Sequence, residues 1–206
     1  MPQKGERRKQ QIVDAAKNMF IERGFQSTHI GQVCEELDIA RGTVYQYFSN
    51  KKEILMALFD STIEKLKDAL DQEDMEEFLK THKSAKDIEE FIKSQFISTM
   101  SIIVNEPIII KLIFKDIQGL DDDVIAIVNK SVLRIKDVIV NAIKKLIELK
   151  VLRNTVNANI TAYMLMGAVM MLIYEYDKKC DDILGRESLN AIVENYLNGT
   201  FNKNLH

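Results

Sequence analysis

The chain has few of the residues that form covalent or metal-bound frameworks. Its 206 residues include two cysteines, two prolines and three histidines. Cys34 and Cys180 lie far apart, without CxxC or Cys/His ligand spacing, so we expect neither a disulfide framework nor a metal site. His29, His82 and His206 are scattered, and no nucleophile elbow or phosphate-binding glycine loop occurs. The sequence therefore predicts neither an enzyme nor a bound cofactor.

Long apolar runs are also missing. Residues 1–11 are polar and basic, without the apolar stretch of a signal peptide. Residues 154–174 lack charge, but they include three asparagines and two threonines. Their unbroken apolar part is shorter than the roughly 20 residues that a membrane-spanning helix requires. We expect no membrane segment and a cytoplasmic location.

The charge of the chain is unevenly distributed. Apolar residues make up 46% of the sequence, which is ample for a helix-rich core, and the net charge is −3. Residues 1–52 hold nine basic against six acidic residues, whereas the remainder holds 19 against 25. This split predicts a basic head at residues 1–52 and an acidic body at residues 53–206.

Residues 28–52 have the pattern of two short helices joined by a tight turn. We expect the first helix at about residues 30–37, with Thr28 as its N-cap and apolar residues at three- and four-residue spacing. Asp38 tolerates the positive φ that a tight turn requires. The second helix is expected at residues 41–48, with Val44 and Phe48 facing inward.

The outward face of the second helix has the chemistry of DNA recognition. An α-helix fits the major groove, where Arg41 can bond a guanine edge and Thr43 can meet a thymine methyl or a phosphate. Lysines at the start of a following helix attract phosphate. An ordinary helical hairpin with a solvated polar face has the same spacing. We predict DNA contacts from Thr28, Arg41, Gly42, Thr43, Tyr45, Gln46, Tyr47, Lys51 and Lys52.

A resemblance separates these two readings. The residues that carry it are Gly24-Phe25, Thr28, the run from Ile39 to Phe48, Asn50-Lys51 and Ile54-Leu55. Together they resemble the N-terminal domain of the TetR (tetracycline-repressor) family over residues 7–60. Asp38 stands where a turn glycine is usual in that family, and Gly31 stands where a larger polar residue able to touch DNA is common. The second departure suggests that base reading depends more on the helix from Arg41.

The remaining pattern predicts helices only, and hence an all-α fold. Further helices are expected at about residues 5–23, 51–70, 75–80, 84–104, 107–119, 121–149, 157–178 and 187–202. The helix at 157–178 is apolar around most of its circumference and must be buried on more than one side. The resemblance implies a homodimer through the last two helices, whereas a monomer core is the alternative. We expect Gly167, Met171, Ile192 and Tyr196 at the dimer interface.

The resemblance also implies a ligand-responsive transcriptional regulator. It would act as a repressor on a palindromic operator in double-stranded DNA, through a head of three helices on a ligand-binding and dimerising body. The effector would be a small apolar or aromatic molecule, and its identity is not in the sequence. The alternative is a small-molecule binding protein whose head no longer reads DNA. We place the ligand at Phe96, Met100, Phe114, Leu133 and Tyr163.

Overall fold

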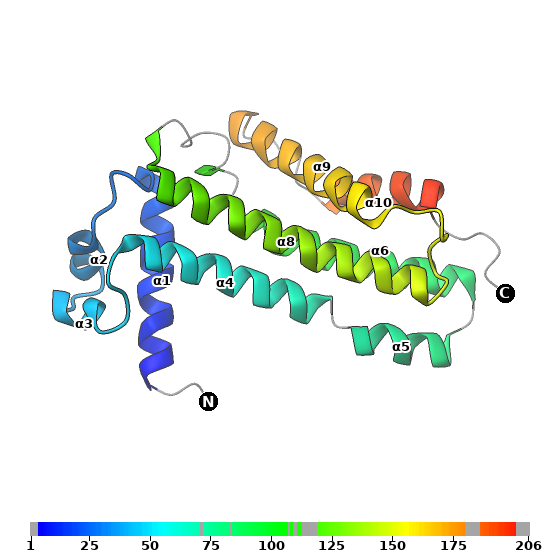
Figure 1. Ribbon diagram of the computed structural model, residues 1–206, viewed down its shortest axis with the longest axis horizontal. Coiled ribbons are helices and arrows are strands. Elements are labelled where there is room, and N and C mark those ends of the chain that lie inside the picture. The colour runs from blue at the N-terminus through cyan, green and yellow to red at the C-terminus, as the bar shows by residue number, and fades with distance from the viewer. Residues whose placement is uncertain are drawn as a thin grey trace. The chain divides into compact units, whose positions relative to one another are not determined.

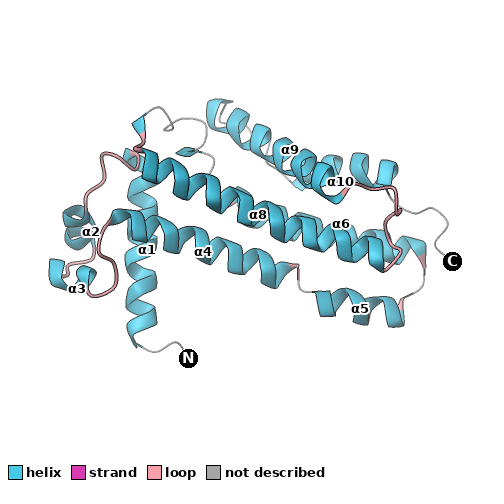
Figure 2. Ribbon diagram, viewed as in Figure 1, coloured by secondary structure: helices cyan, strands magenta, loops and turns pink. Residues whose placement is uncertain are grey.

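The computed structural model describes residues 4–70, 72–82, 84–106, 108, 111–112, 119–179 and 186–200. Within these ranges the chain forms helices and no strands, which confirms the predicted all-α class (Figures 1 and 2). The helices are α1 (Lys4–Arg23), α2 (Ile30–Glu36), α3 (Arg41–Tyr45), α4 (Lys51–Ala69), α5 (Gln72–Thr81), α6 (Ala85–Val104), α8 (Asp122–Glu148), α9 (Ala158–Lys179) and α10 (Arg186–Thr200).

The predicted helices agree with this order, and the differences lie at their ends. Helix α3 ends at Tyr45, earlier than the predicted Phe48, and α5 already begins at Gln72. The helix predicted at 107–119 lies largely outside the described residues. Of that segment, Ile108, Lys111 and Leu112 are helical.

Contacts divide the chain into two compact units. The first unit comprises Met1–Thr62 and Pro107–Ser131, and the second comprises Ile63–Glu106 and Val132–His206. The first unit therefore continues beyond the predicted boundary at residue 52 and takes in a later segment of the chain. Two helices, α4 and α8, contain residues of both units.

The first unit is held together by an aromatic and aliphatic core. The ring centroids of Phe20 and Phe25 lie 5.0 Å apart. Helix α1 buries Ile12, Ala15, Ala16, Met19 and Phe20 on one face. Helices α1, α2 and α3 enclose little apolar surface by themselves, and the segment from residue 107 adds buried side chains at Ile108, Leu112, Val124 and Val128. Each fully buried aliphatic side chain contributes about 1.5–3 kcal/mol.

Polar contacts attach this later segment to the rest of the first unit. The Lys52 ammonium lies 3.0 Å from an Asp121 carboxylate oxygen and 2.8 Å from one of Asp123. The hydrogen bond to Lys52, and then that from the Val124 N–H, lower the pKa of Asp121. The Gln26 amide donates to the Gly119 carbonyl oxygen at 2.6 Å. These contacts join positions that are far apart in the sequence.

The second unit is a helical bundle in which α6 packs against α9 and α10 (Figure 1). Ion pairs on its surface join neighbouring helices: Lys93 of α6 lies 3.5 Å from Glu194 of α10, and Lys145 of α8 lies 2.5 Å from Glu76 of α5. Helix α8 ends in a Schellman motif. Lys150 has a φ of 59°, and the Val151 N–H donates to the Leu146 carbonyl. This turn sends the chain toward α9.

Candidate functional site

The turn between α2 and α3 is fixed by its backbone hydrogen bonds. Asp38 adopts a φ of 49°, as predicted. Its N–H donates to the Glu35 carbonyl and the Ile39 N–H donates to the Cys34 carbonyl, which is the Schellman pattern. An aspartate in place of the usual glycine therefore forms the same kind of turn, since aspartate tolerates the left-handed region.

The outward face of α3 is polar because the apolar side chains of α3 and of the residues that follow it are buried. Val44 is 0% exposed and Phe48 is 3% exposed. With these two side chains in the core, the exposed residues of the segment are Arg41, Gly42, Tyr45 and Gln46, and Thr43 and Tyr47 are half-buried. Six of the nine predicted DNA-contacting residues thus lie in this segment, exposed or half-buried.

Thr28 has a different place from the one predicted. Its side chain is 1% exposed, and its hydroxyl donates to the Gly24 carbonyl at 2.9 Å. The N-cap of α2 is His29, whose N–H donates to the Gln32 side-chain oxygen at 2.8 Å. The prediction that Thr28 caps this helix is wrong, because its hydroxyl instead closes the turn after α1.

Lys51 also has its ammonium group engaged inside the first unit. It donates hydrogen bonds to the carbonyl oxygens of Phe25, Gln26 and Thr28 at 2.8, 2.9 and 3.1 Å. Burial lowers the pKa of Lys51, and the ammonium lies 4.6 Å from the centroid of the Phe25 ring. All three of its donors thus have acceptors within the protein.

Lys52, the other lysine predicted to attract phosphate, is paired with acidic side chains. Its hydrogen bond to Asp123, followed by that to Asp121, raises the pKa of Lys52. The basic side chains near α3 come instead from α1. An exposed groove is lined by Lys4, Gly5, Arg7, Arg8, Gln11, Thr43 and Tyr47. Thr43 and Tyr47 therefore share a surface with basic residues that suit a phosphate backbone.

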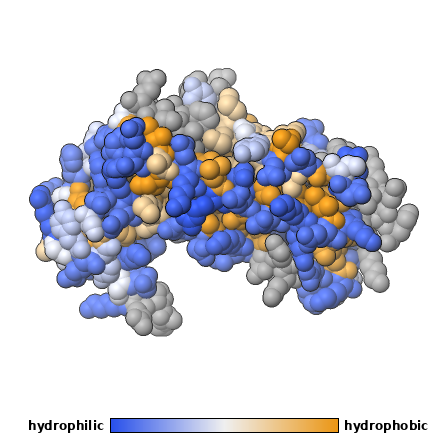
Figure 3. Space-filling view, in the orientation of Figure 1, coloured by the Kyte–Doolittle hydropathy of each residue, from blue (hydrophilic) through white to orange (hydrophobic). Residues whose placement is uncertain are grey.

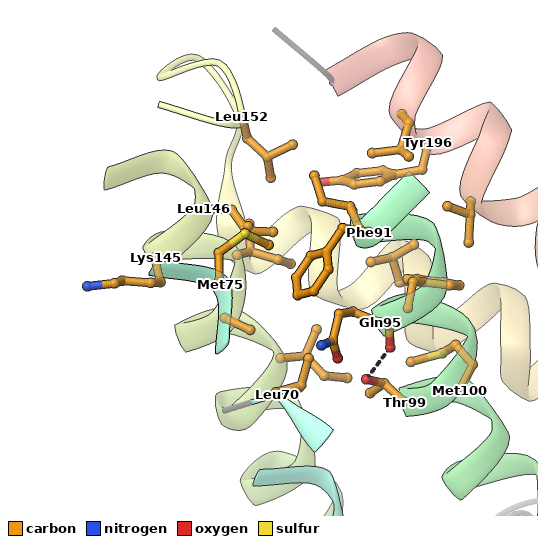
Figure 4. Close-up of a pocket in the computed structure, with 18 residues that line it drawn as sticks. Leu70, Met75, Phe91, Gln95, Thr99, Met100, Lys145, Leu146, Leu152 and Tyr196 are labelled. Atoms are coloured by element: carbon orange, nitrogen blue, oxygen red, sulfur yellow. Dashed lines mark hydrogen bonds between the residues drawn. The ribbon is translucent and has the colours of Figure 1, made fainter. Parts of the chain in front are cut away.

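The second unit contains a partly open apolar cavity of about 110 Å³ (Figure 4). Helices α6, α8 and α10 supply most of its lining, with Met75 from α5 and Leu165 from α9. The polar lining groups are few. Gln95 turns its amide toward the cavity, and the Thr99 hydroxyl donates to the Gln95 carbonyl at 2.7 Å. Lys145 is the one charged residue in the described lining, and its ammonium points away toward Glu76.

The cavity includes only part of the predicted ligand site. Phe96 and Met100 line it, and Phe114 lies outside the described residues. Leu133 and Tyr163 do not line it, because their side chains are 51% and 55% exposed. Residues that line the cavity but were not predicted include Phe91, Gln95, Thr99 and Leu146.

The predicted dimer residues fall into two groups. Gly167 and Met171 lie on α9 beside exposed apolar side chains, and apolar patches interrupt the hydrophilic surface in Figure 3. Ile192 is half-buried, and Tyr196 lines the cavity with a buried hydroxyl oxygen. Along α9, large apolar side chains recur on the surface at three-, four- and seven-residue intervals: Ile160, Tyr163, Met164 and Met171.

No helix in the described ranges combines the length and apolar character needed to cross a bilayer.

The described residues form an all-helical protein with an N-terminal helix-turn-helix, and sequence comparisons show what this head resembles. Residues 12–58 match the family described as "Bacterial regulatory proteins, tetR family". The chain is 35% identical over 77 residues to the fatty acid metabolism regulator protein of Bacillus subtilis (strain 168), which covers 37% of each protein. The chain spans about a third of the length of the first curated relatives that it matches. Residues 12–58 therefore carry the DNA-binding-domain pattern of the TetR family.

Two further likenesses extend beyond the head. The chain is 23% identical over 194 residues to the uncharacterized HTH-type transcriptional regulator YhgD of Bacillus subtilis, covering 92% of this chain and 94% of the relative. The structure of the transcriptional regulator FadR from Bacillus subtilis in complex with stearoyl-CoA matches with a TM-score of 0.61 at 20% identity. That match covers 89% of this chain and 96% of the other. At this identity it shows a shared fold.

We predict that Lys51→Met lowers the free energy of unfolding by about 1–3 kcal/mol, because three carbonyl oxygens lose a charged donor. Urea denaturation followed by circular dichroism measures the change. Lys52→Met is the matched control and should have a smaller effect, since its ion pairs with Asp121 and Asp123 are more exposed. Equal effects of the two substitutions would contradict a structural role for Lys51.

Proposed function

We propose that the protein is a transcriptional repressor that reads a palindromic operator as a homodimer and is released by a small apolar effector. The observation that carries the proposal is the polar face of α3. Arg41, Tyr45 and Gln46 are exposed there, on a helix fixed from behind by Val44 and Phe48. Such a helix fits the major groove, where arginine bonds guanine edges and tyrosine hydroxyls reach the phosphates.

The cavity supports the effector part of the proposal. Its described lining is almost entirely apolar, and the ammonium of Lys145 is held by Glu76, so the described lining leaves no charged group available to an ionised ligand. FadR from Bacillus subtilis was solved with stearoyl-CoA. A cavity of about 110 Å³ suits a much smaller molecule, of the size of a single aromatic ring. We infer a neutral, compact apolar effector.

Helix α4 provides a covalent path for the signal. It begins with Lys51, which is anchored in the first unit, and Leu70, which follows its last residue, lines the cavity. A ligand that displaces Leu70 would bias the direction of α4. In a dimer, such a change alters the separation of two reading helices, which must match half-sites about 34 Å apart.

The exposed stripe on α9 supports the homodimer. Ile160, Tyr163, Met164 and Met171 place large apolar side chains in water on one helix. A Cβ added at Gly167 would meet nothing within 4 Å, so the middle of the stripe has room for a second helix. Two copies of α9 packed along this stripe would remove the apolar side chains from water.

The test of DNA reading compares Arg41→Ala with wild type on an operator selected from random duplexes. Loss of a bidentate base contact should weaken operator binding by about 1–3 kcal/mol and relax the preference at one base position. Fluorescence anisotropy with selected and scrambled duplexes measures both effects. Arg23→Ala removes the same charge from the exposed end of α1 and should leave the preference unchanged. If wild type selects no sequence, the protein is instead a small-molecule binder with an inactive head.

We predict that small neutral aromatic compounds raise the thermal unfolding temperature, whereas the corresponding carboxylates do not, because the described lining of the cavity offers no available cation. Ala142→Phe fills the cavity from α8 and should abolish the shift. Ala126→Phe places the same ring at an exposed position of α8 and should retain it. Stabilisation by the carboxylates alone, or an undiminished shift in Ala142→Phe, would place the ligand elsewhere.

Met171→Glu should convert the dimer into a monomer, since it adds a charge to the exposed stripe of α9. Light scattering at micromolar concentration reports the molecular mass. Asn129→Glu adds the same charge at an exposed position of α8 and should leave the dimer intact. A wild-type monomer that binds the palindrome tightly would rule out the dimer.

A further inference from the structure

Gly31 occupies a helical position that does not require glycine. It is the second residue of α2, and its φ is not positive, since Gly24 is the one described glycine with a positive φ. Alanine is more favourable than glycine in a helix. The backbone therefore does not account for glycine at this position.

The space beside Gly31 is occupied by the guanidinium group of Arg41. A Cβ added at Gly31 would lie 2.8 Å from Arg41 Nη2, 3.5 Å from Cζ and 3.7 Å from Nε. The first distance is too short for two atoms that are not bonded. Any side chain at position 31 would thus force the guanidinium to move.

This close approach is particular to the pair. A Cβ added at Gly42 or Gly119 would meet nothing within 4 Å. Gly31 and Arg41 line one exposed cleft, together with His29, Ile30, Gln32, Glu35, Tyr45, Ser49, Asn50 and Lys51. The guanidinium consequently lies in a seat formed by the first turn of α2, on the surface that carries the reading residues of α3.

We propose that Gly31 is a specificity-determining residue. Because Gly31 has no side chain, the Arg41 guanidinium can lie in this seat beside α2, and its position there sets the direction from which the guanidinium meets a base. The inference rests on the proposed DNA-reading function. An arginine side chain has many rotamers, and ordering them on binding is unfavourable. A seat that already restricts the guanidinium reduces this loss for the one base position that it faces and for no other.

The contact with Arg41 follows from the absence of a side chain at position 31. Here the position contributes no side chain, and the guanidinium from the neighbouring helix takes the space. A substitution at residue 31 should therefore change specificity through Arg41, although it leaves every residue of α3 in place.

A double-mutant cycle with Gly31→Ala and Arg41→Ala tests the proposal. Anisotropy with full-length protein measures binding to the selected operator and to a duplex changed at the base whose preference Arg41→Ala relaxes. Gly31→Ala should lower the discrimination between the two duplexes by about fivefold or more. In the Arg41→Ala background the same methyl group has no guanidinium to displace, and discrimination should change by less than about twofold.

Thermal unfolding separates this effect from a loss of structure. The close contact falls on the movable end of a side chain, and alanine favours the helix, so Gly31→Ala should unfold at the same temperature as wild type or higher. Should it unfold lower, the double variant, which has no guanidinium to clash with, must regain wild-type stability. Full discrimination in Gly31→Ala, or equal losses in both backgrounds, would overturn the inference and leave DNA reading intact. If wild type selects no duplex, the proposed function fails, and the inference fails with it.

Discussion

The first unit is held together at the Lys51 ammonium, which backbone carbonyl oxygens of the α1–α2 connection surround. The connection from α1 to α2 has carbonyl oxygens at Phe25, Gln26 and Thr28 that no helix satisfies, and Lys51 donates one hydrogen bond to each. Buried or half-buried carbonyl groups need such partners, and a lysine has three donors to give. This interaction fixes the start of α4 against the turn that precedes the reading helices.

The same arrangement changes how the protein can attract DNA. Lys51 is held by carbonyl groups and Lys52 by Asp121 and Asp123, so neither ammonium is placed as an exposed phosphate contact. The basic residues at the start of α1, which share a groove with Thr43 and Tyr47, take that place in our account. In the same account base reading falls to Arg41, whose guanidinium lies in the space that a side chain at Gly31 would take. Phosphate contact and base recognition are thus assigned to different helices.

The sequence predicted those features that depend on neighbouring residues. Val44 and Phe48 at four-residue spacing predicted the buried side of the reading segment, and Asp38 predicted the positive φ of the turn. The role of Lys51 was not predictable, because its partners are backbone carbonyls more than twenty positions earlier, which have no sequence signature. The resemblance and the apolar composition of the body likewise placed Leu133 and Tyr163 at the ligand, but neither shows whether another helix covers these residues. Gly31 was visible as a departure, whereas its contact with Arg41 required coordinates.

The central claim is that occupancy of the apolar cavity controls binding to DNA. The most direct measurement titrates the operator complex of the full-length protein with a neutral aromatic compound shown to occupy the cavity, and follows anisotropy. The account predicts that operator affinity falls as the cavity fills and reaches a plateau when every cavity is occupied. The plateau follows because the ligand changes operator affinity by a fixed factor, which is the ratio of the affinities of the ligand-free and ligand-bound protein for the operator. An operator affinity that stays constant while the cavity becomes fully occupied would contradict the account.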